Sequence, residues 1–376
     1  MTGGKHLHII SFDIPYPPNY GGVIDVYYKL VALAKAGIRV HLHCFEYHRK
    51  RSEELEKLCH VVHYYPRERG FPPSFHVKPY IVNSRKSKSL PEKLLEDRYP
   101  ILFEGLHSCY FLSDPRLKDR LKVYRESNIE HHYYYHLFRA EKRIFPKIFY
   151  LAESLKLRYF QEILGHADLM LTVSKEDNNY LERKFPGKRV AYLPSFHKSN
   201  EVAILPGKGN FNLYHGQLGV PENNRAAEFL IREVMEEEMM PLVIAGLNPP
   251  STLIQLALEK PDVKVISDPG EEEMSALIRD AHINVMPSFQ ATGLKLKLVN
   301  ALFTGRFCLV SPEMVHGTEL ADLCMIARSA EEFRSGIREL AKKEFTAEMI
   351  RERAGRLTDL HSNDENCKIL LDLLNL

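Results

Sequence analysis

The chain has 376 residues, a length that suits two domains of ordinary size better than one. Hydrophobic residues make up 44% and charged residues 27% of the sequence, which excludes a mainly disordered chain. The 51 basic and 49 acidic residues leave a formal net charge of +2, too balanced for a dedicated nucleic-acid-binding protein.

The beginning of the chain predicts a strand, a glycine loop, a helix and a second strand. Residues 6–12 are a short apolar run, and residues 15–22 are rich in proline and glycine. Apolar residues then recur at helical spacing until Gly37, and a second apolar run follows at 39–47. This strand-helix-strand unit indicates a parallel sheet with helices on its faces.

The remaining predicted strands form two series separated by a polar linker candidate at 195–210. The first series continues with strands predicted at 61–65, 101–106, 122–125, 168–174 and 189–193. The second has strands predicted at 211–215, 242–245, 263–267, 283–287, 307–310 and 325–327, with helices such as 225–237 and 271–280 between them. We therefore expect an α/β protein of two doubly wound halves, with ligands beyond the carboxyl ends of the strands and the cleft between the halves as the site.

Cysteine usage and the start of the chain bear on its compartment. The six cysteines form no CxxC pair and no metal-type Cys/His spacing, so a reduced compartment is the simplest interpretation. No signal-peptide core follows Met1, and no run approaches 18 apolar residues. These features predict a cytoplasmic protein.

Two glycine-containing segments are candidates for binding an anion. Gly21 and Gly22 follow the first strand and open a helix, where backbone N–H groups and the helix dipole favour an anion. The segment is neither a P-loop nor GxGxxG, and a tight turn with no ligand is the alternative. Lys295 and Lys297, after Gly293, fall in the first turn of a second predicted helix, where they oppose the dipole unless an anion is bound. The alternative there is a solvated lysine face.

The segment 287–320 resembles the donor-binding segment of family 4 glycosyltransferases of the GT-B fold. That family's pattern of Gly, Arg, Lys, Glu-Ala and a later Gly is matched here by Gly293, Lys297, Ala301 and Gly305, with Lys295 in place of Arg. Segments 15–45, 124–134, 167–177 and 214–230 resemble other parts of the same family in the same order. The resemblance therefore extends over nearly the whole chain.

The resemblance implies a GT-B architecture of two Rossmann-like domains. The acceptor-binding domain would comprise 1–196, with a C-terminal helix at 361–376 packing back on it, and the nucleotide-sugar-binding domain 197–360. The implied reaction is transfer of a sugar from a nucleotide diphosphate sugar to a glycan or lipid-linked acceptor, with retention at the anomeric carbon, in the synthesis of a cell-envelope or exported polysaccharide. No cofactor or metal is expected, because Lys295 and Lys297 can supply the charge that Mg²⁺ supplies elsewhere and no DxD loop is present.

The resemblance also assigns roles to individual positions. His107, after an apolar strand, matches the family's histidine beside the donor sugar, and with Lys297 it would be catalytic; the alternative is an ordinary polar residue. Asn300 and Thr292 stand where the family has glutamates near the ribose and the sugar, and an amide bonds a diol less strongly than a carboxylate does. The other assignments are Gly21, Gly22, Gly293, Lys295 and Lys297 for the diphosphate, Pro269 and Gly270 for the base, and Asn19 and Glu130 for the acceptor side.

Three alternatives remain open from the sequence. Glu130 can instead form a loop salt bridge. The segment 67–93, with seven basic residues among aromatic ones, suits either an anionic lipid surface or lipid-linked acceptor, giving a peripheral membrane contact, or a solvated loop. The chain can also be a nucleotide-sugar epimerase of the same fold, or a weakened homologue that binds a nucleotide sugar or acts as a scaffold, as Asn300 and Thr292 suggest. No nucleic-acid-binding motif is present, so that partner is not expected.

Overall fold

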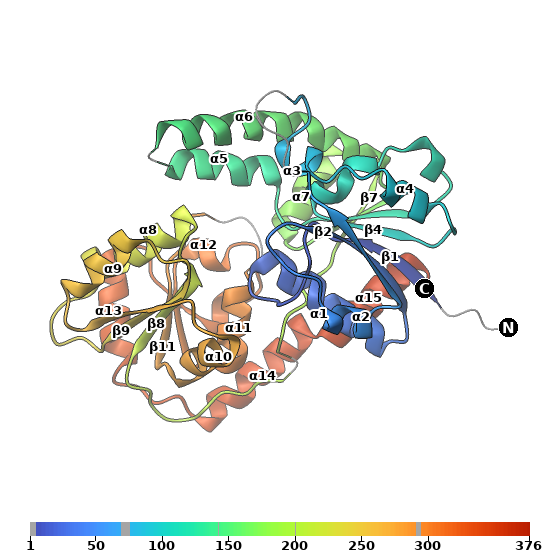
Figure 1. Cartoon of the computed structure of the whole chain (residues 1–376). Helices are drawn as coiled ribbons and strands as arrows, with labels where there is room; N and C mark the ends of the chain where they lie inside the picture. The colour runs from blue at the N-terminus through green and yellow to red at the C-terminus, as the bar shows by residue number, and fades with distance from the viewer. Residues whose placement is uncertain (1–4, 69–75, 142, 200, 291–294) are drawn as a thin grey trace. The chain divides into compact units, whose positions relative to one another are not determined.

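The computed structural model describes residues 5–68, 76–141, 143–199, 201–290 and 295–376, without the side chains of 358–361. The described chain divides into two compact units (Figure 1). The first contains residues 5–197 and 363–376, and the second contains 198–290 and 295–362. Each unit is a parallel sheet covered by helices, which confirms the predicted α/β fold class.

The first unit is built on a parallel sheet with seven strands in its described part, in the order β3-β2-β1-β4-β5-β6-β7. Its central strands are short runs buried on both faces, as expected where helices cover both sides of a parallel sheet. The strands are β1 His6–Ile10, β2 Arg39–Glu46, β3 Val61–Pro66, β4 Ile101–Glu104, β5 Lys122–Arg125, β6 Leu169–Thr172 and β7 Arg189–Tyr192.

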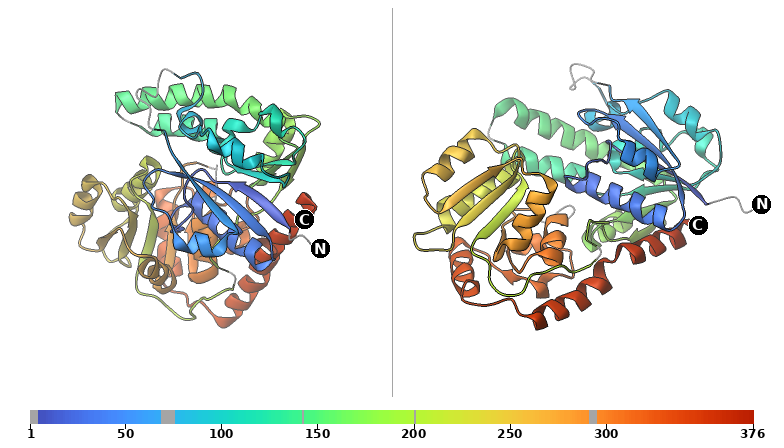
Figure 2. Two further views of the ribbon diagram at one scale, coloured as in Figure 1. Left: turned by 45° about the vertical axis from the view of Figure 1, so that its right-hand side comes forward. Right: turned by 60° about the horizontal axis from the view of Figure 1, so that its bottom comes forward.

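Helices of the first unit follow the strands and bury apolar faces on the sheet. α1 begins at Gly21 directly after the first loop and ends at Lys35, before Gly37 at φ +78°. The last helix, α15, lies beside α1 in two views, and its Cys367, Leu370 and Leu374 join the core cluster of α1 (Figures 1 and 2). The helices are α1 Gly21–Lys35, α2 Glu53–Leu58, α3 Tyr80–Asn83, α4 Ser89–Leu94, α5 Glu130–Ala140, α6 Ile144–Phe160, α7 Lys175–Lys184 and α15 Asn363–Leu374, with 3₁₀ turns at Leu106–Phe111, Pro115–Leu117 and Gln161–His166.

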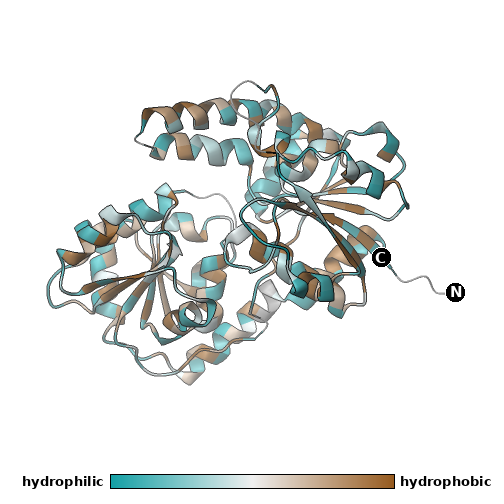
Figure 3. Cartoon of the chain, in the orientation of Figure 1, coloured by the Kyte–Doolittle hydropathy of each residue, from teal (hydrophilic) through white to brown (hydrophobic). Residues whose placement is uncertain are grey.

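α5 and α6 run side by side and extend beyond the sheet (Figure 2). α6 carries large apolar side chains that are exposed, and brown apolar segments alternate with teal polar ones along it (Figure 3). These side chains are Ile144, Phe145, Ile148, Leu155 and Tyr159, between 60% and 86% exposed. Buried Glu153 and Ser154 mark the opposite side of α6, where Ser154 Oγ donates to the carbonyl of His131 in α5 at 2.8 Å.

The second unit repeats the doubly wound pattern with a smaller sheet. Its described part has six parallel strands in the order β10-β9-β8-β11-β12-β13. They are β8 Asn212–Gln217, β9 Leu242–Leu247, β10 Val263–Ser267, β11 Ile283–Met286, β12 Phe307–Val310 and β13 Met325–Ile326. Gly246 of β9 lies opposite Gly216 of β8, and a Cβ there would overlap the Gly216 carbonyl oxygen. The two strands therefore approach closely only because this position has no side chain.

The helices of the second unit cover both faces of its sheet. The predicted helix at 225–237 begins earlier, at Pro221, and its last turn, Leu230–Val234, is a π-helix. The helices are α8 Pro221–Phe229, α9 Ser251–Leu258, α10 Glu271–Asp280, α11 Leu296–Thr304, α12 Pro312–Val315, α13 Ala330–Leu340 and α14 Ala347–His361, with a 3₁₀ turn at Ala321–Leu323.

A cluster of buried charged side chains holds the chain after β7, near the point where it leaves the first unit. Lys29 Nζ lies 2.6 Å from Glu104 Oε1 and 3.0 Å from Asp25 Oδ2. Arg125 pairs with Asp25 at 3.3 Å and donates to the carbonyls of Leu193 at 2.6 Å and Pro194 at 3.1 Å. Because these buried charges are paired and hydrogen-bonded, they hold the chain where it leaves β7.

The chain positions at the border of the two units are joined by a side-chain amide. Asn363 Oδ1 accepts from the backbone N–H of His197 at 3.1 Å, and its Nδ2 donates to the carbonyl of His197 at 2.7 Å. Both groups belong to the first unit and are buried. The place where the chain leaves this unit and the place where it returns are therefore directly bonded.

Candidate functional site

Three neighbouring strands of the first unit bring four of the predicted site residues to one edge of the sheet. Gly21 and Gly22 follow β1, His107 follows β4 and Glu130 follows β5, and these strands are adjacent in the order β1-β4-β5. Since all the strands are parallel, the segments that follow them leave from the same carboxyl edge. The structure thus places these predicted residues at a common edge.

The first loop is shaped by packing as well as by its glycines. α1 has no acidic residue in its first turn, and Tyr20 at its N-cap makes no side-chain cap. A Cβ on Gly22 would lie 2.5 Å from the ring of Phe12, so this position also needs a glycine for packing alone. Gly21 and Gly22 are therefore compatible with an anion at the helix start, but close packing explains Gly22 equally well.

His107 and Glu130 form a buried pair. Gly105, at φ +67°, turns the chain after β4 so that the following 3₁₀ turn carries His107. The His107 side chain is 19% exposed and its Nδ1 lies 3.7 Å from Glu130 Oε1, whose side chain is 3% exposed. This Nδ1 has no hydrogen-bond partner in the described part of the chain. Glu130 is the first residue of α5, so it lies in a helix and not in a loop.

Burial sets the protonation of this pair. It lowers the pKa of His107 well below its usual value, and Arg85 and Arg67 lower it further. It raises the pKa of Glu130 to about 8, against an opposing effect of Arg85. At neutral pH the pair is therefore a neutral imidazole beside a carboxyl group that is mostly protonated.

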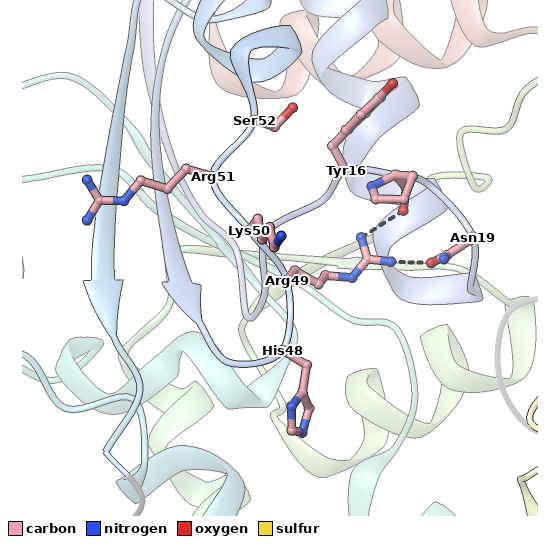
Figure 4. A pocket seen from close by; sticks show the side chains of 8 residues that line it. Tyr16, Asn19, His48, Arg49, Lys50, Arg51 and Ser52 are labelled. Atoms are coloured by element: carbon pink, nitrogen blue, oxygen red, sulfur yellow. Dashed lines mark hydrogen bonds between the residues drawn. The ribbon is translucent and has the colours of Figure 1, made fainter.

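A pocket of about 410 Å³ lies beside the first loop (Figure 4). The Arg49 guanidinium reaches across it, donating to the carbonyls of Ile14 at 3.1 Å and Pro17 at 2.7 Å and contacting the side-chain oxygen of Asn19. The lining residues are Tyr16, Pro17, Asn19, His48, Arg49, Lys50, Arg51 and Ser52. The predicted acceptor-side residue Asn19 therefore lies in the wall of a pocket rich in basic side chains.

The basic segment 67–93 is largely engaged within the first unit. Arg85 is 5% exposed and donates to the Phe12 carbonyl at 2.6 Å, so it lies beneath the site rather than on a surface. Lys86 pairs with Glu68 at 3.0 Å, and the ammonium of Lys78 lies 3.8 Å from the ring centre of Tyr110. Residues 69–75 lie outside the described residues. The basic side chains of Arg85, Lys86 and Lys78 therefore already have partners within the first unit.

In the second unit, Lys297 occupies the first turn of α11, beside the end of β8. Its Nζ lies 5.3 Å from the centre of the Tyr214 ring. Burial lowers its pKa to about 8, with Glu222 raising it and Lys295 lowering it. Lys295 stands at the N-cap, and its Nζ reaches the Gln290 carbonyl at 3.5 Å. The structure brings both predicted lysines to the start of one helix, without an acidic residue in that turn.

Glu222 is the charged partner of this lysine pair that sequence reasoning missed. It lies in the first turn of α8, accepts from Ser288 Oγ at 3.1 Å and is contacted by the Gln290 side-chain amide. Burial raises its pKa, while Lys297 lowers it. Its sequence position gave only the ordinary signal of an acidic residue at a helix start. His215, inside β8, completes the cluster: burial lowers its pKa to about 3, and Lys297 lowers it further.

The other predicted residues of the second unit are placed as follows. Asn300 lies in α11, and its carbonyl accepts from Thr304 Oγ1 at 2.7 Å. Pro269 and Gly270 form the turn between β10 and α10, after Asp268 at φ +50°, whose carboxylate accepts from the Asn248 N–H at 2.7 Å. Thr292 and Gly293 lie outside the described residues. Among the described helices, none combines the length and the apolarity needed to cross a bilayer.

Comparison with known proteins shows which family and which folds the chain resembles. Residues 210–343 match the family model of "Glycosyl transferases group 1". A relative from Klebsiella pneumoniae, described as an uncharacterized 44.6 kDa protein in the cps region, is 27% identical over 330 residues, covering 82% of this chain and 84% of the relative.

Two solved structures extend the similarity over the whole chain. TarM from S. aureus, in a complex that contains alpha-GlcNAc-glycerol and UDP, superposes with a TM-score of 0.68 at 10% identity, covering 99% of this chain and 100% of TarM. HepE from Anabaena, in complex with UDP and glucose, gives a TM-score of 0.65 at 11% identity, covering 99% of this chain and 100% of HepE. At these identities the superpositions show the fold alone. The chain therefore has the two-domain GT-B fold, and its residues 210–343 are similar to glycosyl transferases group 1.

Proposed function

We propose that the chain is a retaining glycosyltransferase that transfers a sugar from a nucleotide diphosphate sugar, without a metal ion, to an acceptor in the synthesis of a cell-envelope or exported polysaccharide. The observation that carries the proposal is the pair of lysines at the start of α11, with the pKa of Lys297 held at about 8 by burial. The family model covers this segment.

The donor is assigned to the second unit. A nucleotide diphosphate brings negative charge to a helix start that has two lysines and no acidic residue in its first turn. The charge of Lys297 is opposed by burial and favoured by Glu222, so a diphosphate would stabilise it further. The leaving diphosphate would gain most from Lys297, because a partly buried ammonium group acts in an environment less polarisable than water. The bound UDP in TarM and HepE favours a uridine nucleotide.

The acceptor is assigned to the first unit. The pocket beside the first loop is lined by His48, Arg49, Lys50 and Arg51, so it favours an acceptor that carries negative charge, such as a pyrophosphate-linked lipid or an acidic glycan. His107 and Glu130 would contact sugar hydroxyls, since one is a neutral imidazole and the other a protonated carboxyl group. The cps-region relative supports a polysaccharide product.

Product formation with and without a chelator tests the proposal. UDP-sugars are incubated with lipid-linked acceptors in the presence or absence of EDTA, and the anomeric configuration of the product is read by NMR. We expect equal turnover in both conditions and the configuration of the donor in the product. Complete loss of activity that Mg²⁺ restores would refute metal independence, and conversion of the donor without an acceptor would identify an epimerase.

A peripheral membrane contact is part of the proposal, and α6 is the element that supports it. With 3.6 residues per turn, its five exposed apolar residues fall within about 100° of the helix circumference. Lys147 and Arg158 flank this stripe on one side and Lys156 on the other. An apolar stripe with basic flanks is typical of a helix that lies in the interface of an anionic membrane. We therefore propose that α6, and not the segment 67–93 expected from the sequence, forms the membrane contact.

A further inference from the structure

Histidine side chains gather on one face of the first unit's sheet. β1 carries His6 and His8, and β2 carries His41 and His43; residues two apart in a strand point to the same face. β1 and β2 pair in parallel, with His8 opposite His41, and His60 directly precedes β3. The sequence hides this grouping, because His6 and His41 are neighbours only through strand pairing.

Part of the group is held by hydrogen bonds alone. The Tyr65 hydroxyl lies 2.8 Å from His43 Nδ1, and His43 Nε2 lies 2.8 Å from His8 Nδ1. The other nitrogen of His8, Nε2, lies 2.9 Å from the Asp97 carboxylate. Both ring nitrogens of His8 and of His43 therefore already have partners within the protein.

The remaining three imidazoles have the spacing of a metal site. The ring centres of His6 and His41 are 5.1 Å apart, those of His6 and His60 5.3 Å, and those of His41 and His60 5.2 Å. One nitrogen from each ring lies within 4.8 Å of the other two. For imidazoles bound to one tetrahedral zinc ion at the usual Zn–N distance, ring centres are expected about 5 Å apart. The near-equal sides of this triangle match that geometry.

We propose that His6, His41 and His60 bind one divalent transition-metal ion of the zinc class, with water as the fourth ligand. Imidazole nitrogens favour zinc and its neighbours over Mg²⁺ and Ca²⁺, which prefer oxygen ligands. His60 is exposed, which leaves one side of the site accessible to water. His6 Nδ1 and His41 Nε2 are 2.8 Å apart, so they share a hydrogen bond. An ion bound to both nitrogens would replace this bond, and the shared proton would move to the other nitrogen of its ring.

Two neighbouring groups support the site. The Tyr99 ring stacks on His6 at 4.4 Å and an interplanar angle of 9°, which fixes the orientation of that imidazole. Asp97 provides a fixed carboxylate nearby, held by Arg120 at 3.2 Å and by the N–H of Tyr99 at 3.0 Å. Asp97 also forms a second group of potential ligands with His8 and His41, so His41 belongs to both groups.

The ion would link β1, β2 and the start of β3 at the amino ends of these strands. The predicted catalytic residue His107 follows the carboxyl end of β4, at the other edge of the same sheet. The metal would therefore stabilise the fold of the first unit and take no part in sugar transfer.

Titration of the chelator-stripped full chain with Zn²⁺ tests the proposal, with isothermal calorimetry for stoichiometry and affinity and thermal unfolding for stability. We expect one Zn²⁺ per chain and a higher melting temperature in its presence. His60→Ala should lower the affinity by more than about 100-fold, because changes that only affect the support of a metal ligand already cost 10- to 100-fold. Because His60 is exposed, the variant should still fold, and circular dichroism checks this.

His63→Ala is the matched control. His63 stacks on His43 at 4.9 Å on the same sheet and belongs to neither group of potential ligands, so this variant should bind Zn²⁺ like the wild type. Weak binding of several ions that survives in His60→Ala would show adventitious binding and overturn the proposal. EDTA should lower the melting temperature without reducing turnover below that temperature, so failure of the metal site and failure of the proposed reaction give different results.

Discussion

At the residue scale, Lys297 shows what a lysine at a helix start can do when it is partly buried. Its side chain lies beside the Tyr214 ring, and Glu222 opposes the effect of burial on its pKa. An exposed lysine in the same turn would only weaken the helix by opposing its dipole. The charge pattern of the sequence identified Lys295 and Lys297 as candidates, but their carboxylate partner is 73 residues or more away in the chain and emerged only from the fold.

Replacement of Lys297 tests its role in turnover. Lys297→Ala should reduce kcat by about 100- to 1,000-fold, because it removes one charged donor from the leaving diphosphate, equivalent to about 3 to 4 kcal/mol. Lys295→Ala should lose less if its side chain only borders the site. Steady-state kinetics and the affinity for UDP measure both effects. Lys264→Ala, at an exposed position of β10, is the control. Near-normal turnover in Lys297→Ala would show that the lysine is part of a solvated face and does not act on the diphosphate.

The depressed pKa of Lys297 gives a pH dependence whose sign is fixed. The protonated ammonium binds the diphosphate, so UDP affinity should fall as the pH rises through about 8. Glu222→Gln should move this fall to lower pH because Glu222 raises the pKa of Lys297, whereas Lys297→Arg should abolish it. Calorimetric titration between pH 6.5 and pH 9.5 measures the midpoint, and a flat wild-type profile would contradict the assignment.

The same shift affects stability in the opposite direction. The pKa of Lys297 is about 8 in the folded chain and 10.5 for an unperturbed lysine, so the unfolded chain binds more protons between these values. The contribution of this residue to the free energy of unfolding therefore rises with pH across that interval. If UDP affinity falls with rising pH while the contribution of Lys297 to the free energy of unfolding rises, the loss of affinity comes from titration of this lysine. General unfolding at alkaline pH would lower both quantities.

At the element scale, the strands were the easiest part of the fold to predict. Buried parallel strands are short continuous apolar runs, and β5 and β10 begin and end at the predicted residues. The pairing of α5 with α6 and the histidine group of β1 to β3 could not be predicted, since both depend on contacts between elements. The role of each predicted site residue stays a prediction, although the structure brings Lys295 and Lys297 to one helix start and His107 to Glu130.

The apolar stripe of α6 yields a prediction on membrane binding. Phe145→Asp combined with Ile148→Asp should abolish sedimentation of the protein with vesicles that contain anionic lipid, because both side chains are exposed. Around the helix, Ile148 lies in the middle of the apolar stripe and Phe145 at one edge. Weaker binding to zwitterionic vesicles is expected for the wild type. Leu258→Asp, at an apolar residue of α9 that is 74% exposed, is the control. Unchanged vesicle binding in the double variant, or loss of a dimer instead of vesicle binding, would refute the membrane contact.

At the scale of the whole molecule, the buried charges of the first unit matter for stability. Arg125→Ala would leave Asp25 without its guanidinium partner and remove the donors to the carbonyls of Leu193 and Pro194. Breaking a buried ion pair from one side costs about 3 to 5 kcal/mol, so urea unfolding should show a loss of that size. Arg116→Ala removes an ion pair whose arginine side chain is 54% exposed and should leave the urea unfolding midpoint nearly unchanged. Equal effects of the two variants would contradict this reading of the cluster.

The hydrogen bonds between Asn363 and His197 bear on how the second unit is inserted into the first along the chain. Because the first unit closes on itself at this point, the second unit, 198–362, is an insertion within a host domain whose cut ends are already adjacent. Joining 197 to 363 through a short Gly-Ser bridge should leave a single autonomous domain, whereas a fragment ending at 197 would expose the α1 surface that α15 covers. Exchange of the second unit between related chains would therefore need both junctions to be transplanted together.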